Sequence, residues 1–187
     1  MGIQSKTVAT VLATVCLFGF ASRAYSADEA MTAALVRSAN VGRAAPDFVG
    51  ISNWLNSGAL SIADLRGKVV LVDFWTYDCY NCVNTLPYVT RLYRAYRDKG
   101  LVVIGVHTPE FPFERSTTNV QTALRRHGIT YPVAQDNDYA TWKAYHNEYW
   151  PAQYIVDQDG RVVFEHAGEG QYEEIERTIQ RLLNVNG

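Results

Sequence analysis

Cysteine is scarce in this sequence, and this scarcity limits the roles that its cysteines can have. Three cysteines occur among 187 residues, and Cys16 lies in an apolar N-terminal run that we expect to be removed. The other two, Cys79 and Cys82, form a C-x-x-C pair. A disulfide-stabilised secreted scaffold carries several pairs, and one bond between such close residues closes too small a loop to stabilise much. The pair is therefore expected to take part in chemistry.

An excess of charge of one sign is also absent. The 17 basic and 19 acidic side chains leave a formal net charge of −2, with no basic stripe and no block of like charges. A nucleic acid is therefore not an expected partner. The sequence has no internal repeat and no low-complexity run. Its 48% hydrophobic share suits one globular domain with a short additional segment.

The first residues have the layout of a secretory signal peptide. Lys6 precedes an apolar run at 7–20, and small residues that suit a cleavage site follow it. The run is shorter than the roughly 20 residues that a membrane-spanning helix needs, although an uncleaved anchor remains an alternative. We therefore assign 1–26 to a signal peptide and expect the protein in the periplasm or elsewhere outside the cytoplasm.

Hydrophobic patterns predict one α/β domain at 46–187, preceded by a linker or N-terminal arm at 27–45. The continuous apolar run 69–75 is typical of a strand that is buried on both faces, and helical spacing follows it at 81–97. Residues 52–58 are short strand and turn material and predict a β-rich N-terminal extension. The further expected strands are 101–106, 131–134, 153–156 and 161–165, and the further expected helices are 117–127, 138–145 and 172–183.

The C-x-x-C pair lies where the first central strand turns into its helix. A helix N-terminus offers unpaired N–H groups and the positive end of the helix dipole, and both favour a thiolate over a thiol. Cys79 is expected at the turn as the exposed attacking sulfur, and Cys82 one helical turn further in. This spacing suits a two-step exchange, in which Cys79 attacks and Cys82 resolves the mixed disulfide.

Other uses of a C-x-x-C pair lack their usual companions here. A zinc site needs a second Cys pair or a spaced His pair, and His107, His127, His146 and His166 show no such spacing. Haem attachment needs a histidine directly after the pair, where Val83 stands. No metal and no cofactor are therefore expected, and an inert structural disulfide is the remaining alternative.

Several segments resemble a known family. The segment 71–82 (LVDFWTYDCYNC) resembles the active-site segment of thioredoxins, and Pro87 matches their helix-kinking proline. The strings at 105–111 (GVHTPEF), 131–138 (YPVAQDND) and 149–152 (YWPA) are similar to the TlpA/DipZ-like redoxin branch of the thioredoxin-like superfamily. The resemblance covers about 41–187. It implies a thioredoxin-like fold, with a central mixed sheet flanked by helices, and disulfide exchange outside the cytoplasm, in some members during cytochrome c maturation.

The resemblance also implies the catalytic residues. Cys79 and Cys82 are the redox pair and form a disulfide when oxidised. Asp73 matches the buried acid that relays a proton to or from the resolving cysteine, a role that suits a carboxyl whose pKa is raised by burial. A structural Asp bonded to the backbone is the alternative for this position.

Five further residues are expected to form the substrate-binding surface. Pro151 matches the family's cis-proline, which faces the cysteine pair, and Trp75 matches a packing residue beside the site. The backbone of the residue before the cis-proline pairs with the substrate in the family, but Trp150 is much bulkier than its counterpart in thioredoxin, which argues against broad substrate access. Tyr80 and Asn81 stand where thioredoxins have Gly and Pro, a dipeptide that tunes the redox potential.

Three loop residues near the pair complete the candidates. Asp78 is expected to point to solvent. Glu110 and His107 follow the second central strand, at the sheet edge where α/β proteins place their sites. We expect Glu110 to be a solvated loop acid rather than an active-site residue, and the roles of Glu110 and His107 stay open.

The favoured function is that of an exported, monomeric thiol–disulfide oxidoreductase that reduces protein disulfides. Its expected partners are protein dithiol or disulfide substrates and a membrane or exported thiol electron donor. A thiol peroxidase is an alternative; those enzymes place Pro and then Thr ahead of a single cysteine, and Thr76 fits this pattern whereas Val72 does not. A copper- or haem-handling binding module is a third hypothesis, because thiolates hold Cu(I), but no Met-rich or His-rich stretch supports it.

Overall fold

The computed structural model describes residues 42–185, so the predicted signal peptide and most of the predicted linker lie outside the described residues. Within this part of the chain, six strands form one sheet in the order β1-β4-β3-β2-β5-β6. The strands are β1 (Asn53–Leu55), β2 (Val69–Trp75), β3 (Leu101–His107), β4 (Val133–Gln135), β5 (Ala152–Val156) and β6 (Val162–Ala167). The α-helices are α2 (Tyr80–Tyr96), α3 (Thr117–His127), α4 (Ala140–Ala144) and α5 (Tyr172–Leu183), and the 3-10 helices are η1 (Arg97–Lys99) and η2 (Pro112–Arg115).

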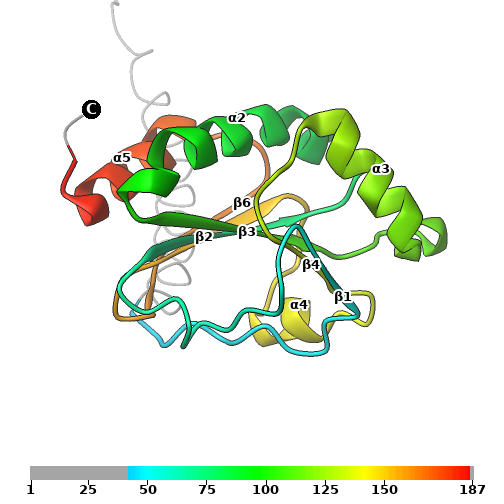
Figure 1. Ribbon diagram of the computed structural model, residues 1–187, viewed down its shortest axis with the longest axis horizontal. Helices are drawn as coiled ribbons and strands as arrows, with labels where there is room; N and C mark the ends of the chain where they lie inside the picture. The colour runs from blue at the N-terminus through cyan, green and yellow to red at the C-terminus, as the bar shows by residue number, and fades with distance from the viewer. Residues whose placement is uncertain (1–41, 186–187) are drawn as a thin grey trace, which may run out of the picture. The chain divides into compact units, whose positions relative to one another are not determined.

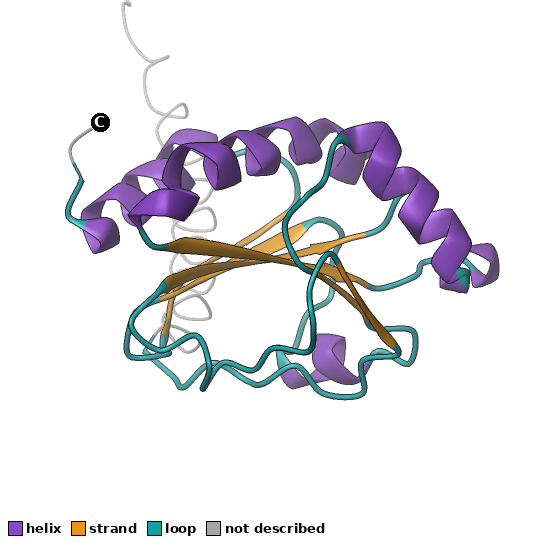
Figure 2. Ribbon diagram, viewed as in Figure 1, coloured by secondary structure: helices purple, strands orange, loops and turns teal. Residues whose placement is uncertain are grey.

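Helices lie on both faces of the sheet (Figure 1). One face is covered by α2, α3 and α5, and the other by α4 together with irregular segments, which are teal in Figure 2. The strands β2, β3 and β4 run parallel, whereas β1, β5 and β6 pair antiparallel with their neighbours. The predicted α/β fold, with a central mixed sheet flanked by helices, is confirmed.

The strand β2 lies between β3 and β5, and all of its residues are buried. Its side chains alternate between the two faces, as in any strand. Leu71 and Trp75 pack in the core cluster of the α2 face, whereas Phe74 packs in the cluster of the α4 face. Asp73 alternates in step with Leu71 and Trp75 and therefore points to the α2 face, where Cys82 is buried.

Most predicted elements agree with the structure to within one or two residues. The helices α3 and α5 have the predicted bounds, and α2 begins one residue earlier than expected. The end of α3 follows from Gly128, whose φ of 63° is left-handed and favours glycine.

The helix α4 is shorter than the predicted range 138–145. Tyr139 has a φ of 60°, which a right-handed helix excludes, so the helix begins only at Ala140. The carboxylate of Asp136 caps it, because its oxygens accept hydrogen bonds from the backbone N–H groups of Thr141 at 3.2 Å and Trp142 at 2.8 Å.

The β-rich extension is small within the described residues. It consists of β1, three residues long, and of an isolated bridge formed by Ala44. Gly42 and Ala45 already donate backbone hydrogen bonds to the segment 160–162, so pairing begins ahead of Pro46. None of the helices between residues 42 and 185 has the length and apolar character that crossing a membrane requires.

Candidate active site

Cys79 is the N-cap residue of α2, at the point where the chain leaves β2 and enters the helix. Its backbone is extended, with φ −83° and ψ 118°, and its sulfur accepts a hydrogen bond from the backbone N–H of Cys82 at 3.4 Å. The sulfur thus satisfies one of the donors that a helix N-terminus leaves unpaired. The structure places the pair at the strand-to-helix turn, as the sequence predicts.

The two sulfurs differ in burial and in acidity, and both occur as free thiols. Cys79 is half-buried. Its pKa is lowered to about 7, first because the Cys82 thiol donates a hydrogen bond to it, although burial and the charge of Glu110 act in the opposite direction. Cys82 is fully buried, and burial raises the pKa of its thiol far above the ordinary value. Near neutral pH, Cys79 is therefore the available nucleophile and Cys82 its protonated partner.

Asp73 is a buried carboxyl on the face of the sheet that carries Cys82. Its side chain is 1% exposed, and burial raises its pKa from 3.8 to about 7. Oδ1 accepts a hydrogen bond from Nε2 of Gln153 at 3.2 Å, which opposes this rise. The charge of Asp73 also raises the pKa of Cys82. A carboxyl that titrates near neutrality beside a thiol has the acidity needed to exchange a proton with it.

Gly105, which lies opposite Asp73 in the sheet, has no side chain and leaves room for Trp75 and Tyr131. Asp73 pairs across the sheet with Gly105 on β3 and with Gln153 on β5. A Cβ on Gly105 would lie 3.0 Å from Nε1 of Trp75 and 3.1 Å from Cε2 of Tyr131. Tyr131 is fully buried, and its pKa is raised well above the ordinary value, first by burial and then by the charge of Asp73. Neither Gln153 nor Tyr131 was predicted as a site residue, because cross-strand register is not visible in the order of the chain.

Trp75 is fully buried at the end of β2. Its ring meets that of His107 edge to face, with the centroids 5.2 Å apart. The side chain packs in the same cluster as Cys82. Trp75 is therefore a packing residue, but it has no exposed surface with which to contact a substrate, contrary to our expectation, because β2 is covered on both faces.

The Trp150–Pro151 peptide bond is cis, which is the geometry that the resemblance implies. The Trp150 side chain is turned into the fold. Its indole N–H donates a hydrogen bond to the carbonyl of Thr108 at 3.0 Å, and its ring packs against Trp142 with the centroids 4.2 Å apart. These contacts hold the bulky ring in a partly buried position, and a role of Trp150 and Pro151 in substrate binding stays a prediction.

Four side chains around Cys79 are exposed. Tyr80, between the cysteines, is 78% exposed, and Asn81 is exposed beside it. Asp78 faces solvent, as expected. Glu110 is exposed as well, but its charge raises the pKa of Cys79. Glu110 is thus a loop acid whose field reaches the nucleophile, so it belongs to the electrostatic surroundings of the site.

A buried polar network next to the pair was missed in the sequence. Glu114 in η2 is fully buried and accepts hydrogen bonds from the hydroxyl of Thr76 and from the backbone N–H of Asp78. The same hydroxyl lies 3.3 Å from Nε2 of His107. His107 is fully buried, and burial lowers its pKa to about 4, so its ring is neutral near pH 7. A glutamate in a predicted loop has the pattern of a surface residue, which is why Glu114 escaped prediction.

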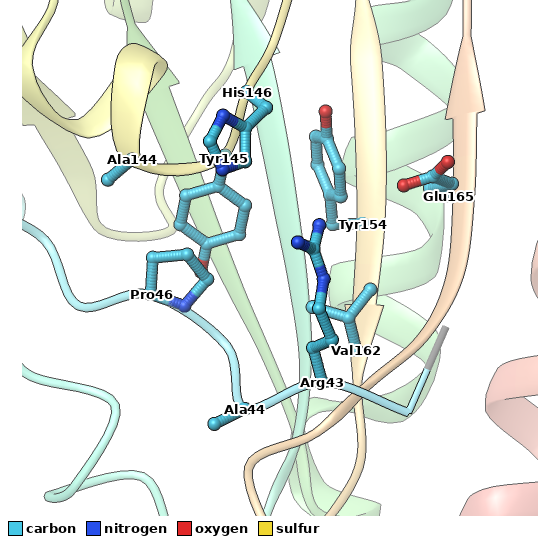
Figure 3. A pocket seen from close by; sticks show the side chains of 9 residues that line it. All are labelled: Arg43, Ala44, Pro46, Ala144, Tyr145, His146, Tyr154, Val162 and Glu165. Carbon is cyan, nitrogen blue, oxygen red and sulfur yellow. The ribbon is translucent and has the colours of Figure 1, made fainter. Parts of the chain in front are cut away.

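The cavity in Figure 3 lies on the α4 face, and its lining includes Arg43, Tyr145, Tyr154 and Glu165. None of these is a predicted site residue. Because Cys82 packs on the opposite face of the sheet, this cavity is not part of the redox site. Among residues 42–185, no group of three or more His, Cys, Asp or Glu side chains is placed to hold a metal ion.

Comparisons with known proteins agree with this geometry. A family model described as the AhpC/TSA family matches residues 41–165. Protein DipZ of Mycobacterium bovis is 50% identical over 143 residues, which are 75% of this chain and 21% of that protein. The chain thus spans about one fifth of the length of this relative. The thiol-disulfide oxidoreductase YkuV of Bacillus subtilis is 32% identical over 139 residues, which are 74% of this chain and 93% of that protein.

The fold is also found among solved structures. The solution structure of a thioredoxin-like protein in the oxidised form matches with a TM-score of 0.69 at 30% sequence identity, and the match covers 77% of this chain and 97% of that chain. The position of the two sulfurs at a helix N-terminus, the fold and these relatives all point to the same family. The chain therefore belongs to the AhpC/TSA family, has a thioredoxin-like fold, and is similar to thiol–disulfide oxidoreductases, with Cys79 and Cys82 as its C-x-x-C pair.

Proposed function

We propose that this protein is exported and reduces disulfides in protein substrates through Cys79 and Cys82. The observation that carries the direction is the pKa of Cys79, which is lowered only to about 7. The nucleophile of a reducing thioredoxin has a pKa of about 7, whereas that of the strong oxidant DsbA is about 3.5. A thiolate stabilised that strongly favours the reduced protein and makes its disulfide an oxidant. The pKa of Cys79 is closer to that of thioredoxin than to that of DsbA, which supports a role as a reductant.

The first step uses the half-buried sulfur. The Cys79 thiolate attacks one sulfur of a substrate disulfide, the substrate S–S bond breaks, and the released substrate sulfur leaves with the electron pair as a thiolate. The product is a mixed disulfide between Cys79 and the substrate. The exposed Tyr80 and Asn81 lie beside this sulfur and are proposed to contact the substrate chain, together with the backbone around Pro151.

The second step uses the buried sulfur and the buried acid. Ionised Asp73 takes the proton of the Cys82 thiol, and the resulting thiolate attacks the sulfur of Cys79. The Cys79–Cys82 disulfide forms, and the second substrate sulfur leaves with its electron pair. Two electrons have then passed to the substrate, and the proton on Asp73 returns to solvent or to the leaving thiolate. The pKa of Asp73, about 7, suits both halves of this transfer.

A membrane or exported thiol protein is proposed to reduce the Cys79–Cys82 disulfide again. The layout of residues 1–26 supports export, and in an oxidising compartment a reductant needs such a supply of electrons. A part in cytochrome c biogenesis, where cysteines must be reduced before haem is attached, fits the TlpA/DipZ resemblance and belongs to this proposal.

Three measurements test the proposal. The equilibrium of the pair with glutathione should give a reduction potential near that of thioredoxin, about −270 mV, and a value near about −120 mV would contradict the reducing direction. Insulin reduction should be abolished in Cys79→Ser, and unchanged turnover would exclude this chemistry. Fractionation of cells that make the full-length chain should recover it outside the cytoplasm.

Two further assays test the alternative functions. Peroxide consumption faster than insulin reduction would favour the thiol peroxidase alternative. Tight Cu(I) binding in a metal titration would favour the binding module.

A further inference from the structure

Glu114 is a fully buried carboxylate that the mechanism above does not use. Its Oε1 accepts hydrogen bonds from the hydroxyl of Thr76 and from the backbone N–H of Asp78, the latter at 3.2 Å. Its Oε2 accepts from the backbone N–H groups of Glu110 and Phe111, at 2.6 and 2.8 Å. One side chain thus joins the loop that precedes α2 to the loop that follows β3.

This arrangement fixes the two loops relative to each other. Removing a carboxylate from water costs free energy, which charge-assisted hydrogen bonds must offset. Four donors converge on Glu114, about as many as a carboxylate can accept. Two come from each loop, so this one buried side chain bridges them.

Thr76 extends the contact toward the redox pair. Its hydroxyl has a single proton, which it donates to Glu114, so Nε2 of His107, 3.3 Å away, is the donor to the Thr76 oxygen. The neutral ring of His107 has one N–H to give, and this contact places it on Nε2. The Thr76 side chain is therefore held from two sides.

The backbone of Thr76 reaches the second sulfur. Its N–H donates a hydrogen bond to Cys82, which lowers the pKa of that thiol, although burial raises this pKa by far more. A hydrogen bond of this kind is strongest when the acceptor carries a full negative charge. Cys82 carries that charge only while it attacks Cys79 or leaves it.

We propose that Glu114 is a positioning residue of the redox centre, which holds Thr76 so that the Thr76 N–H stabilises the Cys82 thiolate during thiol–disulfide exchange. The inference rests on the proposed redox function of the pair. Glu114 touches neither sulfur; it acts through Thr76, which contacts Glu114 through its hydroxyl and Cys82 through its backbone.

The step that reports on this role is the opening of the Cys79–Cys82 disulfide by dithiothreitol. A dithiothreitol thiolate attacks the accessible sulfur of Cys79, the bond between the cysteines breaks, and Cys82 leaves with the electron pair as a thiolate. The second thiol of dithiothreitol then displaces Cys79 and closes the oxidised dithiothreitol ring. Two electrons and two protons pass from dithiothreitol to the protein.

Stopped-flow reduction of the oxidised full-length chain, followed by tryptophan fluorescence, measures this step. Glu114→Gln keeps the size of the side chain but turns an amide N–H group toward N–H donors, and Thr76→Val keeps the shape without the hydroxyl. Both variants are expected to open about tenfold more slowly, the effect of weakening one hydrogen bond to a charged group. Thr76→Ser retains the hydroxyl and should open at the native rate. The Glu114→Gln/Thr76→Val double variant should be no slower than the slower single variant, because both changes remove the same contact.

Asp136 provides the control for a general loss of stability. Its buried carboxylate caps α4 through Thr141 and Trp142 and accepts a hydrogen bond from Thr108. Asp136→Asn is expected to lower the unfolding temperature while the opening rate, measured well below that temperature, stays native. A merely structural role of Glu114 would give the same behaviour in Glu114→Gln.

Native opening rates in both Glu114→Gln and Thr76→Val would overturn the proposal. A Thr76→Ser variant as slow as Thr76→Val would also overturn it. If Glu114→Gln does not fold, the Val and Ser variants of Thr76 decide the question. The reaction needs only a small dithiol, so a failure to reduce protein substrates would reject the proposed function and leave this test intact.

Discussion

Gln153 donates a hydrogen bond to Asp73 across the β2–β5 pair, with Nε2 and Oδ1 3.2 Å apart. The two residues lie 80 positions apart in the chain and directly opposite each other in the sheet. This contact occupies Oδ1, while Oδ2 has no partner among the described residues. Oδ2 is therefore the oxygen that we expect to take the proton from Cys82.

The raised pKa of Asp73 predicts how stability depends on pH. Between 3.8 and about 7, the folded protein keeps the proton on Asp73 that the unfolded chain has lost, so the free energy of unfolding falls as pH rises and levels off above pH 7. At about 1.4 kcal/mol per pH unit, this interval corresponds to about 4 kcal/mol. Asp73→Asn cannot ionise, so its stability relative to the native protein should rise by about that amount between about pH 4 and pH 8.

Urea unfolding under reducing conditions at several pH values measures this difference. A constant difference between Asp73→Asn and the native protein across the range would contradict the pKa assigned to Asp73. Gln121→Ala, at an exposed position that carries no ionisable group, is the matched control and should differ from the native protein by the same amount at every pH.

The burial of Cys82 predicts that its removal traps substrates. Cys82→Ser keeps the Cys79 nucleophile but has no sulfur to resolve the mixed disulfide, so substrate proteins should stay covalently attached to Cys79. Non-reducing gels of cells that make the variant should show adducts that dithiothreitol removes. The same adducts in a Cys79→Ser/Cys82→Ser variant would mean that another group forms them.

The charge of Glu110 predicts a shift in the reactivity of Cys79. Alkylation of Cys79 by iodoacetamide should follow its thiolate fraction, with a midpoint near pH 7. Glu110→Gln removes a negative charge that disfavours the thiolate, so the midpoint should move to lower pH and alkylation below neutrality should become faster. Glu174→Gln, at the start of α5, is the control and should leave the profile unchanged. A midpoint that moves to higher pH in Glu110→Gln would contradict the assigned effect of the Glu110 charge on the pKa of Cys79.

The tight packing beside Asp73 predicts that any side chain at Gly105 destabilises the fold. In Gly105→Ala, the new Cβ would lie 3.0 Å from Nε1 of Trp75, 3.1 Å from Tyr131 and 3.2 Å from Val133. Overpacking of this kind costs about 1–3 kcal/mol, which chemical denaturation measures. Gly58→Ala is the matched control, because its Cβ would meet nothing within 4 Å. Equal stabilities of the two variants would contradict the packing described here.

The sequence predicted the parts of the site that depend on local patterns. The apolar run 69–75 is β2, and the place where it turns into a helix put Cys79 at the N-terminus of α2. The resemblance to thioredoxins identified Asp73 as the buried acid, and its place within that apolar run predicted a raised pKa. These features depend on neighbours in the chain, which periodicity and residue type report directly.

The parts that escaped prediction depend on contacts between distant segments. Gln153 meets Asp73 only because β5 pairs with β2 in a particular register, and Glu114 is buried only because η2 folds against the Thr76–Asp78 loop. A polar residue that is buried by tertiary packing has the same local pattern as an exposed one. The apolar run 69–75 predicted the interior position of Trp75, and its assignment to the substrate-binding surface came from the resemblance, which does not report how completely the ring is covered.

Because Cys82 is inaccessible to solvent, Cys79 is the only sulfur of the pair that can react with a partner. Every electron pair must enter and leave through one solvent-facing atom, although two sulfurs store it. A single adduct on that atom therefore inactivates the whole pair. A reagent that counts reactive thiols between residues 42 and 185 of the folded protein will find one, although the chemistry employs two.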